Sequence, residues 1–292
     1  MITGAARLRK VLAAAAAALV LSSGTAHAAD QVPQSHIYTP TNGVRAEVGE
    51  SVLVTGGGYD GNQSDTLRDY QVSVDGGETW NSGYRTATVP LSGETGITQA
   101  LWAYVFTPEE PGIYTIVSRV NTDTVNGQVS APRTLYVGVT APALPSCYQC
   151  SFYSENPYEY DDEGQPVELG LRFRVDRPGV VTRIITSWNS YEASRVRLWR
   201  ADGTLLADQA VTGVYADPFP TPVPVVPGEE YVASFTSWRG LYRSSQNTFP
   251  ATIIRTPFIV PAHAGVYSYD LGFPTETWHD SYYWVTPELQ RL

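Results

Sequence analysis

Five aromatic residues in the second half of the chain stand among polar neighbours, in segments that the sequence predicts to be loops. An exposed ring on a rigid β surface offers an apolar face to a sugar, and a nearby carboxylate accepts hydrogen bonds from sugar hydroxyls. Because most aromatic rings in proteins pack in or beside a core, core packing is the alternative for each. The sequence therefore predicts a candidate ligand-binding rim made of Trp188, Tyr191, Trp238, Tyr242 and Trp278.

Two other tryptophans, Trp199 and Trp284, lie within apolar, strand-like stretches. Rings in such stretches usually point into the core. We therefore predict that Trp199 and Trp284 stabilise the fold and do not contact a ligand.

The chain has two cysteines, in the motif Cys147-Tyr148-Gln149-Cys150. In an exported protein thiols are usually oxidised, so the two could pair with each other, stay reduced or link two chains. We expect the intrachain bridge. A thioredoxin-like redox motif would need a βαβ setting to lower the thiol pKa, and the sequence shows none.

An acidic run could attract a metal ion, since calcium prefers several carboxylate oxygens. The run consists of Glu155, Glu159, Asp161, Asp162 and Glu163. It lacks the pattern of an EF-hand, so a solvated loop is the simpler interpretation. His36, His263 and His279 have no paired zinc-ligand spacing. The sequence predicts no metal site and no cofactor.

The chain contains no G-x-S-x-G elbow, H-E-x-x-H motif or phosphate-binding loop. The segment Ser73-Val74-Asp75-Gly76-Gly77-Glu78-Thr79-Trp80 matches the Asp-box of sialidase propellers, but propellers repeat this box and here it occurs once. Its Asp and Ser side chains close a tight turn. We therefore predict a structural hairpin here and no catalytic residues.

The elements that must position these residues are predicted to be strands. Val, Thr, Tyr and Trp are abundant, Gly and Pro recur between short apolar runs, and no segment has a sustained helical period. Turn signals every ten or so residues are typical of a β-sandwich. The segment 107–116 resembles a strand-to-strand corner of bacterial immunoglobulin-like domains. The sequence predicts an all-β protein with an immunoglobulin-like sandwich over residues 29–139.

The second half carries a more extensive resemblance, in ordered segments that include 167–173, 198–207, 231–234, 265–269 and 283–285. These segments resemble the secreted bacterial modules named domain of unknown function 4082. The resemblance implies a jelly-roll-like β-sandwich, often found beside immunoglobulin-like modules and polysaccharide-active enzymes. Two departures occur at Ser190-Tyr191-Glu192 and at Ser281 to Thr286, so a polar site that relatives place there is not carried over.

The amino terminus predicts export. Arg7, Arg9 and Lys10 precede an apolar run, and Ala26-His27-Ala28 is typical of a signal-peptidase site. We expect residues 1–28 to be removed, no membrane anchor to remain and the mature protein to be extracellular. Removing three of the 19 basic residues leaves 16 against 29 acidic ones, a net charge of −13. Clustered cations are missing, so nucleic acid is not an expected partner.

These observations divide the chain into the signal peptide, the immunoglobulin-like sandwich, a Pro-containing linker with the Cys motif at 140–151, and the jelly-roll-like sandwich at 152–292. The leading hypothesis is a secreted, non-catalytic protein that binds extracellular or cell-wall polysaccharide through its C-terminal sandwich. One alternative is a structural or adhesive surface protein with a protein partner. The other is an uncharacterised polysaccharide-active enzyme. The sequence does not indicate an oligomeric state.

Overall fold

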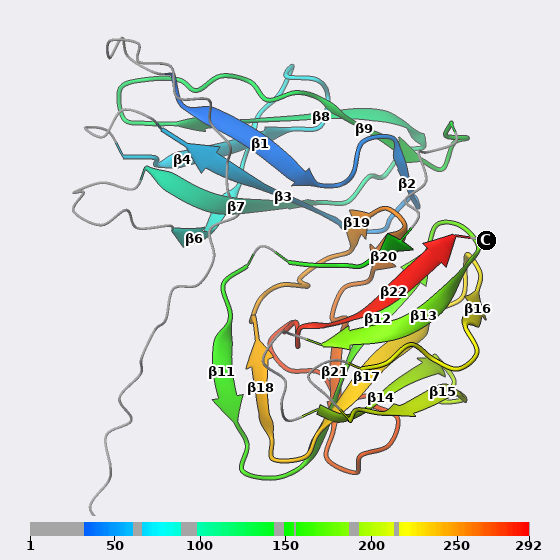
Figure 1. Ribbon diagram of the computed structural model, residues 1–292. Helices are drawn as coiled ribbons and strands as arrows, with labels where there is room; N and C mark the ends of the chain where they lie inside the picture. The colour runs from blue at the N-terminus through cyan, green and yellow to red at the C-terminus, as the bar shows by residue number, and fades with distance from the viewer. Residues whose placement is uncertain are drawn as a thin grey trace, which may run out of the picture.

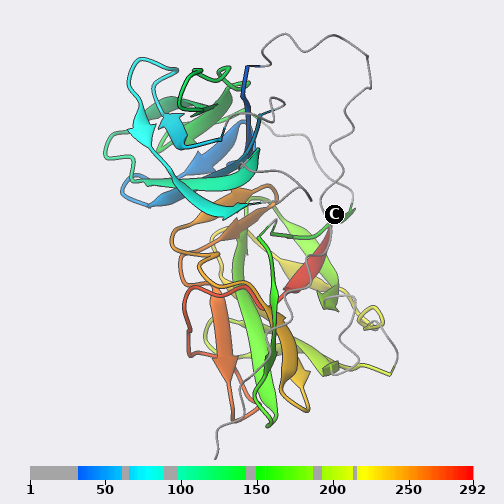
Figure 2. The ribbon, with the colours of Figure 1, turned by 90° about the vertical axis from the view of Figure 1, so that its left-hand side faces the viewer.

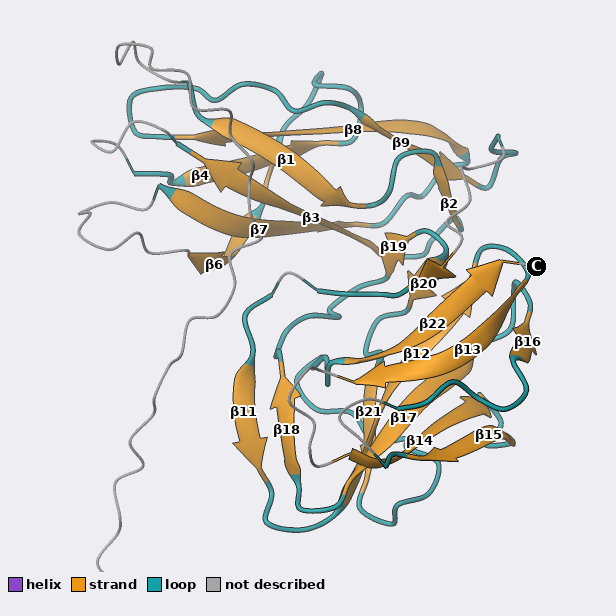
Figure 3. Cartoon of the chain, in the orientation of Figure 1, coloured by secondary structure: helices purple, strands orange, loops and turns teal. Residues whose placement is uncertain are grey.

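The computed structural model describes residues 32–60, 66–88, 98–142, 149–154, 156–186, 193–212 and 216–291. All regular elements in these ranges are β-strands (Figure 3). Within them, no helix has the length and apolar character needed to cross a bilayer. The prediction of an all-β fold is confirmed.

The N-terminal half forms a sandwich of two sheets (Figure 1). One sheet has the order β1 (Gln34–Thr39), β3 (Val52–Tyr59), β7 (Gln99–Phe106) and β6 (Tyr84–Thr88). The other has the order β2 (Val44–Ala46), β9 (Arg133–Val137), β8 (Gly112–Asn121), β4 (Asp69–Ser73) and β5 (Asn81–Ser82). Only the pair β2–β9 is parallel among the ladders of this sandwich. The arrangement fits the immunoglobulin-like sandwich predicted from the sequence.

The core of this sandwich forms around Trp102, which is fully buried. Strand β3 makes room for the ring with Gly56, where a Cβ atom would lie 2.2 Å from the indole. Inward residues of the facing sheet, such as Ile116 and Leu135, close the other side. Apolar side chains from the inner faces of both sheets therefore pack around this ring.

The Asp-box segment forms the predicted structural turn. Ser73 Oγ donates a hydrogen bond to Asp75 Oδ1 at 2.6 Å, and the Thr79 amide donates to the same carboxylate at 3.0 Å. These bonds hold the pKa of Asp75 below its usual range. The ring of Trp80 lies 4.2 Å from the guanidinium of Arg119, which makes the turn a packed surface hairpin.

The C-terminal half forms a second sandwich with an additional ribbon. Its smaller sheet has the order β10 (Gln149–Cys150), β22 (Val285–Arg291), β13 (Gly179–Thr186) and β16 (Val223–Val225). Its larger sheet has the order β15 (Leu205–Ala210), β14 (Ala193–Arg200), β17 (Tyr231–Ser237), β12 (Val167–Val175), β20 (Phe258–Val260) and β19 (Ile253–Arg255), and β21 (Gly265–Ser268) also pairs with β12. The ribbon consists of β11 (Glu159–Asp162) and β18 (Leu241–Ser244).

Strand β12 shows how the sequence pattern sets the core of the larger sheet. Val167, Leu169, Leu171 and Phe173 alternate along it and are all buried in the main core. From the smaller sheet, residues such as Ile184 and Val285 reach the same core. The prediction of a second β-sandwich is therefore confirmed.

The opposite face of β12 is also covered. Trp199 is 8% exposed and packs with Val232, Val266 and the ring of Phe273 as a small second core. Its indole donates a hydrogen bond to Ser234 Oγ at 2.8 Å. The prediction that Trp199 is a core residue is confirmed.

Trp284 lies at the edge of the main core. It is half-buried, packs edge-on against Tyr158 and donates from its indole to Ser245 Oγ at 2.9 Å. This placement agrees with the structural role predicted for it.

The two sandwiches touch through the hairpin β19–β20, which Figure 1 shows between them and Figure 2 shows from the side. Leu53 of β3 donates its amide to Thr252 at 2.8 Å, and the amide of Thr252 donates to Ser51 at 3.0 Å. Ile254 is buried in the core of the N-terminal sandwich. Arg174 pairs with Glu50 at 2.6 Å. Hydrogen bonds, buried side chains and an ion pair therefore join the two halves directly, in addition to the connecting chain.

Cys150 is disulfide-bonded and begins the C-terminal half by pairing β10 with β22. Cys147, the other cysteine of the chain, lies outside the described residues. The Cys147–Cys150 bridge stays a prediction.

Candidate ligand-binding site

A cavity of about 250 Å³ opens on the C-terminal sandwich, between the β11–β18 ribbon and β21. Figure 1 shows these elements beside each other at one edge of the sandwich. Five aromatic residues line the cavity, together with two carboxylates and a few neutral polar groups. The aromatic residues are Tyr242, Tyr267, Tyr269, Trp278 and Tyr283. The carboxylates belong to Asp161 and Glu163.

The ribbon forms one wall of the cavity because of its register. Asp161 lies directly opposite Tyr242, whereas Tyr160 lies opposite Arg243. Since side chains alternate between the faces of a strand, Asp161 and Tyr242 share the cavity face. The guanidinium of Arg243 instead lies 4.2 Å from the ring of Tyr158 and 5.3 Å from that of Tyr160. The register therefore places the Asp161 carboxylate at the cavity and the Arg243 guanidinium on the other face of the ribbon.

Glu163, just beyond β11, joins the two walls. Its carboxylate accepts a hydrogen bond from the Tyr242 hydroxyl at 2.8 Å and one from the Tyr269 hydroxyl at 3.0 Å. The amide of Glu163 donates to the carbonyl of Gly240 at 3.0 Å. Gly240 has a φ of +74°, and a Cβ there would lie 2.4 Å from the Gln165 carbonyl. Only glycine allows this close approach, which fixes Glu163 at the mouth of the cavity.

Strand β21 supplies the second wall. The rings of Tyr267 and Tyr269 meet edge to face at 5.5 Å, and both line the cavity. Glu276 lies close enough to Tyr267 to raise the pKa of that phenol, second to the effect of burial. A third carboxylate thus lies beside the wall without itself lining the cavity.

Trp278 stands at the opening on a tight turn. The Ser281 amide donates to its carbonyl at 3.0 Å, and His279 and Asp280 have φ values of 46° and 50°. Left-handed backbone in residues other than glycine is costly and frequently marks functional sites. The His279 ring stacks on the indole at 4.1 Å. Trp278 nevertheless stays 54% exposed.

The base of the cavity is buried and carries hydroxyl groups. Tyr283 packs edge-on against Tyr242 at 5.8 Å, and burial raises the pKa of its phenol. Ser281 is 1% exposed, and its Oγ makes no hydrogen bond of normal geometry, although it is close enough to Tyr283 to lower the pKa of that phenol. The Ser281 hydroxyl therefore retains hydrogen-bonding capacity beside the cavity.

Asp161 and the tyrosines of the cavity have raised pKa values. Burial raises the pKa of Asp161; the hydrogen bond from Ser244 opposes this, and the charges of Glu159 and Glu163 add to it. Burial and the bond to Glu163 raise the pKa of Tyr269 to about 12. Perturbed groups in a cavity are typical of functional sites, although structural networks also perturb them. Among the described residues, no three His, Cys, Asp or Glu side chains converge as a metal site.

The structure brings together two of the five predicted rim residues, Tyr242 and Trp278. Tyr242 was expected in a loop, but it lies on β18 and packs against the main core, because its ring faces Tyr283. Trp238 lies on the turn before β18, is 62% exposed and does not line this cavity. Trp188 and Tyr191 lie outside the described residues. The assignment of all five as ligand-binding residues stays a prediction.

Sequence reasoning did not select Tyr267, Tyr269 or Tyr283, and it assigned Asp161 and Glu163 to a solvated loop. A period-two signal was present in both segments. Asp161 and Glu163 are two residues apart, as are Tyr267 and Tyr269, and such spacing puts side chains on one face of an extended strand. That signal does not say which two strands face each other.

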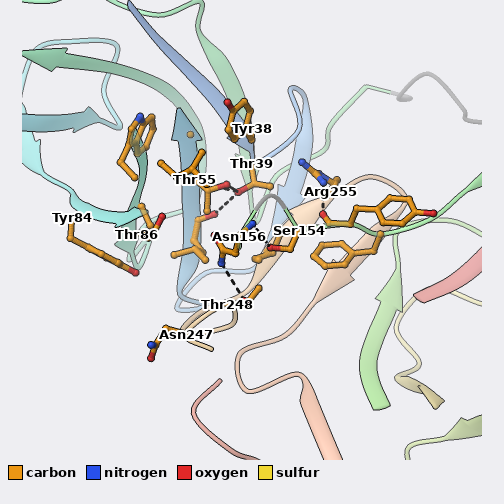
Figure 4. Close-up of a pocket in the computed structure, with 18 residues that line it drawn as sticks. Tyr38, Thr39, Thr55, Tyr84, Thr86, Ser154, Asn156, Asn247, Thr248 and Arg255 are labelled. Atoms are coloured by element: carbon orange, nitrogen blue, oxygen red, sulfur yellow. Dashed lines mark hydrogen bonds between the residues drawn. The ribbon is translucent and has the colours of Figure 1, made fainter. Parts of the chain in front are cut away.

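A second recess lies between the sandwiches, with Tyr84 and Thr86 on one side and Asn156, Asn247 and Thr248 on the other (Figure 4). The Asn156 side chain donates to Thr248 Oγ1 at 3.2 Å across part of it. The recess encloses about 30 Å³. That space suits one or two water molecules and is too small for a sugar unit.

Comparison with known families identifies the C-terminal half. Residues 154–285 match the family described as Domain of unknown function (DUF4082). The resemblance drawn from the sequence is therefore confirmed. No curated protein matches the chain.

Several solved structures show distant likeness. The fibronectin(III)-like modules of Clostridium thermocellum CbhA are 14% identical, with 67% of this chain and 91% of that chain covered and a TM-score of 0.25. The alpha-L-rhamnosidase from Dictyoglumus thermophilum is 11% identical over 82% of this chain and 30% of its own, with a TM-score of 0.24. The Yersinia pseudotuberculosis adhesin InvE is 11% identical over 88% and 58%, with a TM-score of 0.20. TM-scores this low support no functional assignment.

Proposed function

We propose that this chain, whose C-terminal sandwich is a DUF4082 domain, is an exported protein that binds carbohydrate without cleaving it. The ligand is a single sugar unit of an extracellular or cell-wall polysaccharide, held in the cavity between the β11–β18 ribbon and β21. The single observation that carries the proposal is the cavity's combination of five aromatic rings with two carboxylates.

The chemistry of the lining suits a sugar. Trp278 presents an exposed indole, on which the apolar face of a sugar ring stacks. Asp161 and Glu163 accept hydrogen bonds from hydroxyl groups, and Gln246 both donates and accepts. Mixed apolar and polar lining of this kind orients a small polar ligand.

The size of the cavity limits the ligand. Pockets for drug-sized molecules measure roughly 300–1,000 Å³, and this cavity of about 250 Å³ is smaller. It therefore accepts one sugar unit, with the rest of the chain outside. The opening beside Trp278 and Tyr269, both exposed, leaves a path for that chain.

The lining gives less support to hydrolysis. Glycosidases need one carboxyl group that protonates the leaving oxygen and a second on the opposite side of the scissile bond. Glu163 already accepts hydrogen bonds from two tyrosine hydroxyls, so its carboxylate oxygens are engaged within the protein. Asp161 and Glu163 also lie on the same segment, at one wall of the cavity. Binding is therefore the better-supported function.

The proposal is tested by measuring binding of the mature protein, residues 29–292, to a panel of insoluble and soluble polysaccharides, followed by product analysis. We expect retention on at least one polysaccharide, no release of oligosaccharides, and loss of retention in Trp278→Ala. Trp238→Ala is the matched control, because it removes an exposed tryptophan outside the cavity. Retention that is unchanged in Trp278→Ala but lost in Trp238→Ala would move the site to the outer surface.

A further inference from the structure

The cavity is negatively charged and has no cation in its lining. Asp161 and Glu163 line it, and Glu276 pairs through its backbone with Tyr267 in the wall and raises the pKa of that phenol. No arginine, lysine or histidine lines the cavity among the described residues. No Lys or Arg after Lys10 lies outside the described ranges.

Most arginines of the C-terminal sandwich have partners outside the cavity. Six of them form ion pairs with other carboxylates of this half: Arg172–Glu230, Arg177–Asp176, Arg183–Glu288, Arg195–Asp208, Arg197–Glu168 and Arg200–Glu229. Arg243, the nearest along the ribbon, contacts the rings of Tyr158 and Tyr160 on the other face. The fold therefore neutralises many of its acids, whereas no ion pair with Asp161 or Glu163 is present in the described part of the chain.

The aromatic lining is suited to a positive charge as well as to a sugar face. The ring faces of Tyr and Trp attract ammonium groups through their quadrupoles, and cages of such rings are a known way to bind organic cations. Tyr242 and Tyr283 meet edge to face, as do Tyr267 and Tyr269. In each pair the edge of one ring covers one face of the other, so a bound ammonium group would contact the remaining ring surfaces that line the cavity.

The polar lining requires hydroxyl groups as well. Ser281 Oγ is buried without a hydrogen bond of normal geometry, and the amide of Gln246 lies beside the same cavity. Gln246 Oε1 already lies 3.3 Å from Nδ1 of His279, but a simple tetraalkylammonium would leave the Ser281 hydroxyl without a partner. A site with an unpaired buried hydroxyl discriminates against ligands that lack a matching hydroxyl. A uronic acid would meet like charge at Asp161 and Glu163, which costs affinity.

We propose that the unit bound in this cavity is an amino sugar with a free ammonium group, in preference to N-acetylated, neutral or acidic sugars. This inference rests on the proposed carbohydrate-binding function. The ammonium group lies between the carboxylates of Asp161 and Glu163, and the ring hydroxyls face Gln246 and Ser281.

The test compares three trisaccharides by isothermal titration with the mature protein at about pH 6, where the ligand amine is protonated. The probes are glucosamine trisaccharide, its fully N-acetylated form and galacturonic acid trisaccharide. We expect the glucosamine trisaccharide to bind roughly 25-fold more tightly than the acetylated form, because each of its two ammonium–carboxylate pairs contributes roughly fivefold. We expect the acidic trisaccharide to bind most weakly.

Two variants test whether the preference for a free amino group arises in the cavity. Asp161→Asn and Glu163→Gln should each weaken glucosamine trisaccharide binding about fivefold and change binding of the acetylated form by less than about twofold. Asp162→Asn is the matched control. It removes the same charge one residue away, on the ribbon face opposite Asp161, and should leave both affinities unchanged. Melting curves verify that each variant is folded, and either cavity variant alone is sufficient for the test.

The outcomes separate this inference from the proposed function. Equal affinity for the free-amine and acetylated forms, with Trp278→Ala still weakening both, would overturn the amino-sugar preference and leave carbohydrate binding intact. Binding to none of the polysaccharides or trisaccharides would overturn both. Tighter binding of tetramethylammonium or of a lysine peptide than of glucosamine trisaccharide would also overturn the inference, since the ammonium group would then be the whole determinant.

Discussion

Glu168 and Asp161 lie seven positions apart in the sequence, and their carboxylates differ in burial and in hydrogen-bonding partners. Glu168, on β12, is 0% exposed and accepts hydrogen bonds from Arg197 at 2.6 Å and from Ser234 and Thr236 at 2.5 Å. Asp161, on β11, is half-buried at the wall of the cavity, and no cation contributes to its pKa. One carboxylate is fully paired and serves the fold. The other has no cationic partner and is available to a ligand.

A structural acid such as Glu168 and a ligand-binding acid such as Asp161 are told apart by their partners. Burial raises the pKa of both, so the pKa direction alone does not distinguish them. The difference lies in the partners. Arg197 and two hydroxyls satisfy Glu168 within the small core that Trp199 covers, whereas Asp161 has the Ser244 hydroxyl and two neighbouring acids.

The largest effect is expected at Glu168. Glu168→Ala should lower the free energy of unfolding by about 3–5 kcal/mol, because it leaves Arg197, whose side chain is 13% exposed, with only its longer ion pair to Asp208 at 3.7 Å. Urea denaturation measures this. Glu168→Gln, which keeps the shape and part of the hydrogen bonding, should cost less. A loss below about 1 kcal/mol in Glu168→Ala would show that the buried pair is not structural.

Trp199 shares a hydrogen-bonding partner, Ser234, with Glu168. Trp199→Ala should lower the free energy of unfolding by about 3 kcal/mol, since it removes a buried ring and its bond to Ser234. Trp238→Ala should change it by less than about 0.5 kcal/mol, because that ring is exposed on a turn. Thermal and urea unfolding of the two variants compare them directly. Equal losses would mean that Trp238 packs in the core after all.

At the cavity, the main effect of a substitution should be on ligand binding. Trp278→Ala should weaken polysaccharide binding about fivefold to thirtyfold, the range of roughly 1–2 kcal/mol, and leave the melting temperature almost unchanged, because the indole is exposed. Titration and melting of the same preparation give both quantities. A large fall in melting temperature with unchanged affinity would contradict the proposed role of the cavity.

The smallest effect is a gain in stability at Asp161. Its pKa is raised in the folded protein, so ionisation disfavours the folded state, and stability falls as pH rises through the folded pKa. Asp161→Asn should therefore raise the melting temperature at pH 7 and leave it unchanged near pH 3, where the carboxyl is protonated in both states. Asp162→Asn, for which no such gain is expected, is the control. A lower melting temperature for Asp161→Asn at pH 7 would show that Asp161 is stabilising.

Much of the fold could be predicted because it depends on patterns that are local in the chain. Short apolar runs separated by Gly and Pro predicted strands throughout, and the apolar setting of Trp199 predicted core packing. The candidate site was only partly predictable. Tyr242 and Trp278 were selected for their polar neighbours, but the same argument selected Trp238, which lies outside the cavity.

The sequence by itself determined the all-β class, the family resemblance of the C-terminal half and the turn at the Asp-box, because each follows from residue types at fixed, short spacings. Only the tertiary structure decided which acids are neutralised. Arg197 reaches Glu168 across 29 residues, and Asp161 faces Tyr242 across the register of two strands that are far apart in the chain. Such pairings depend on sheet order and on strand register. A change of register by one residue moves every side chain of a strand to the other face.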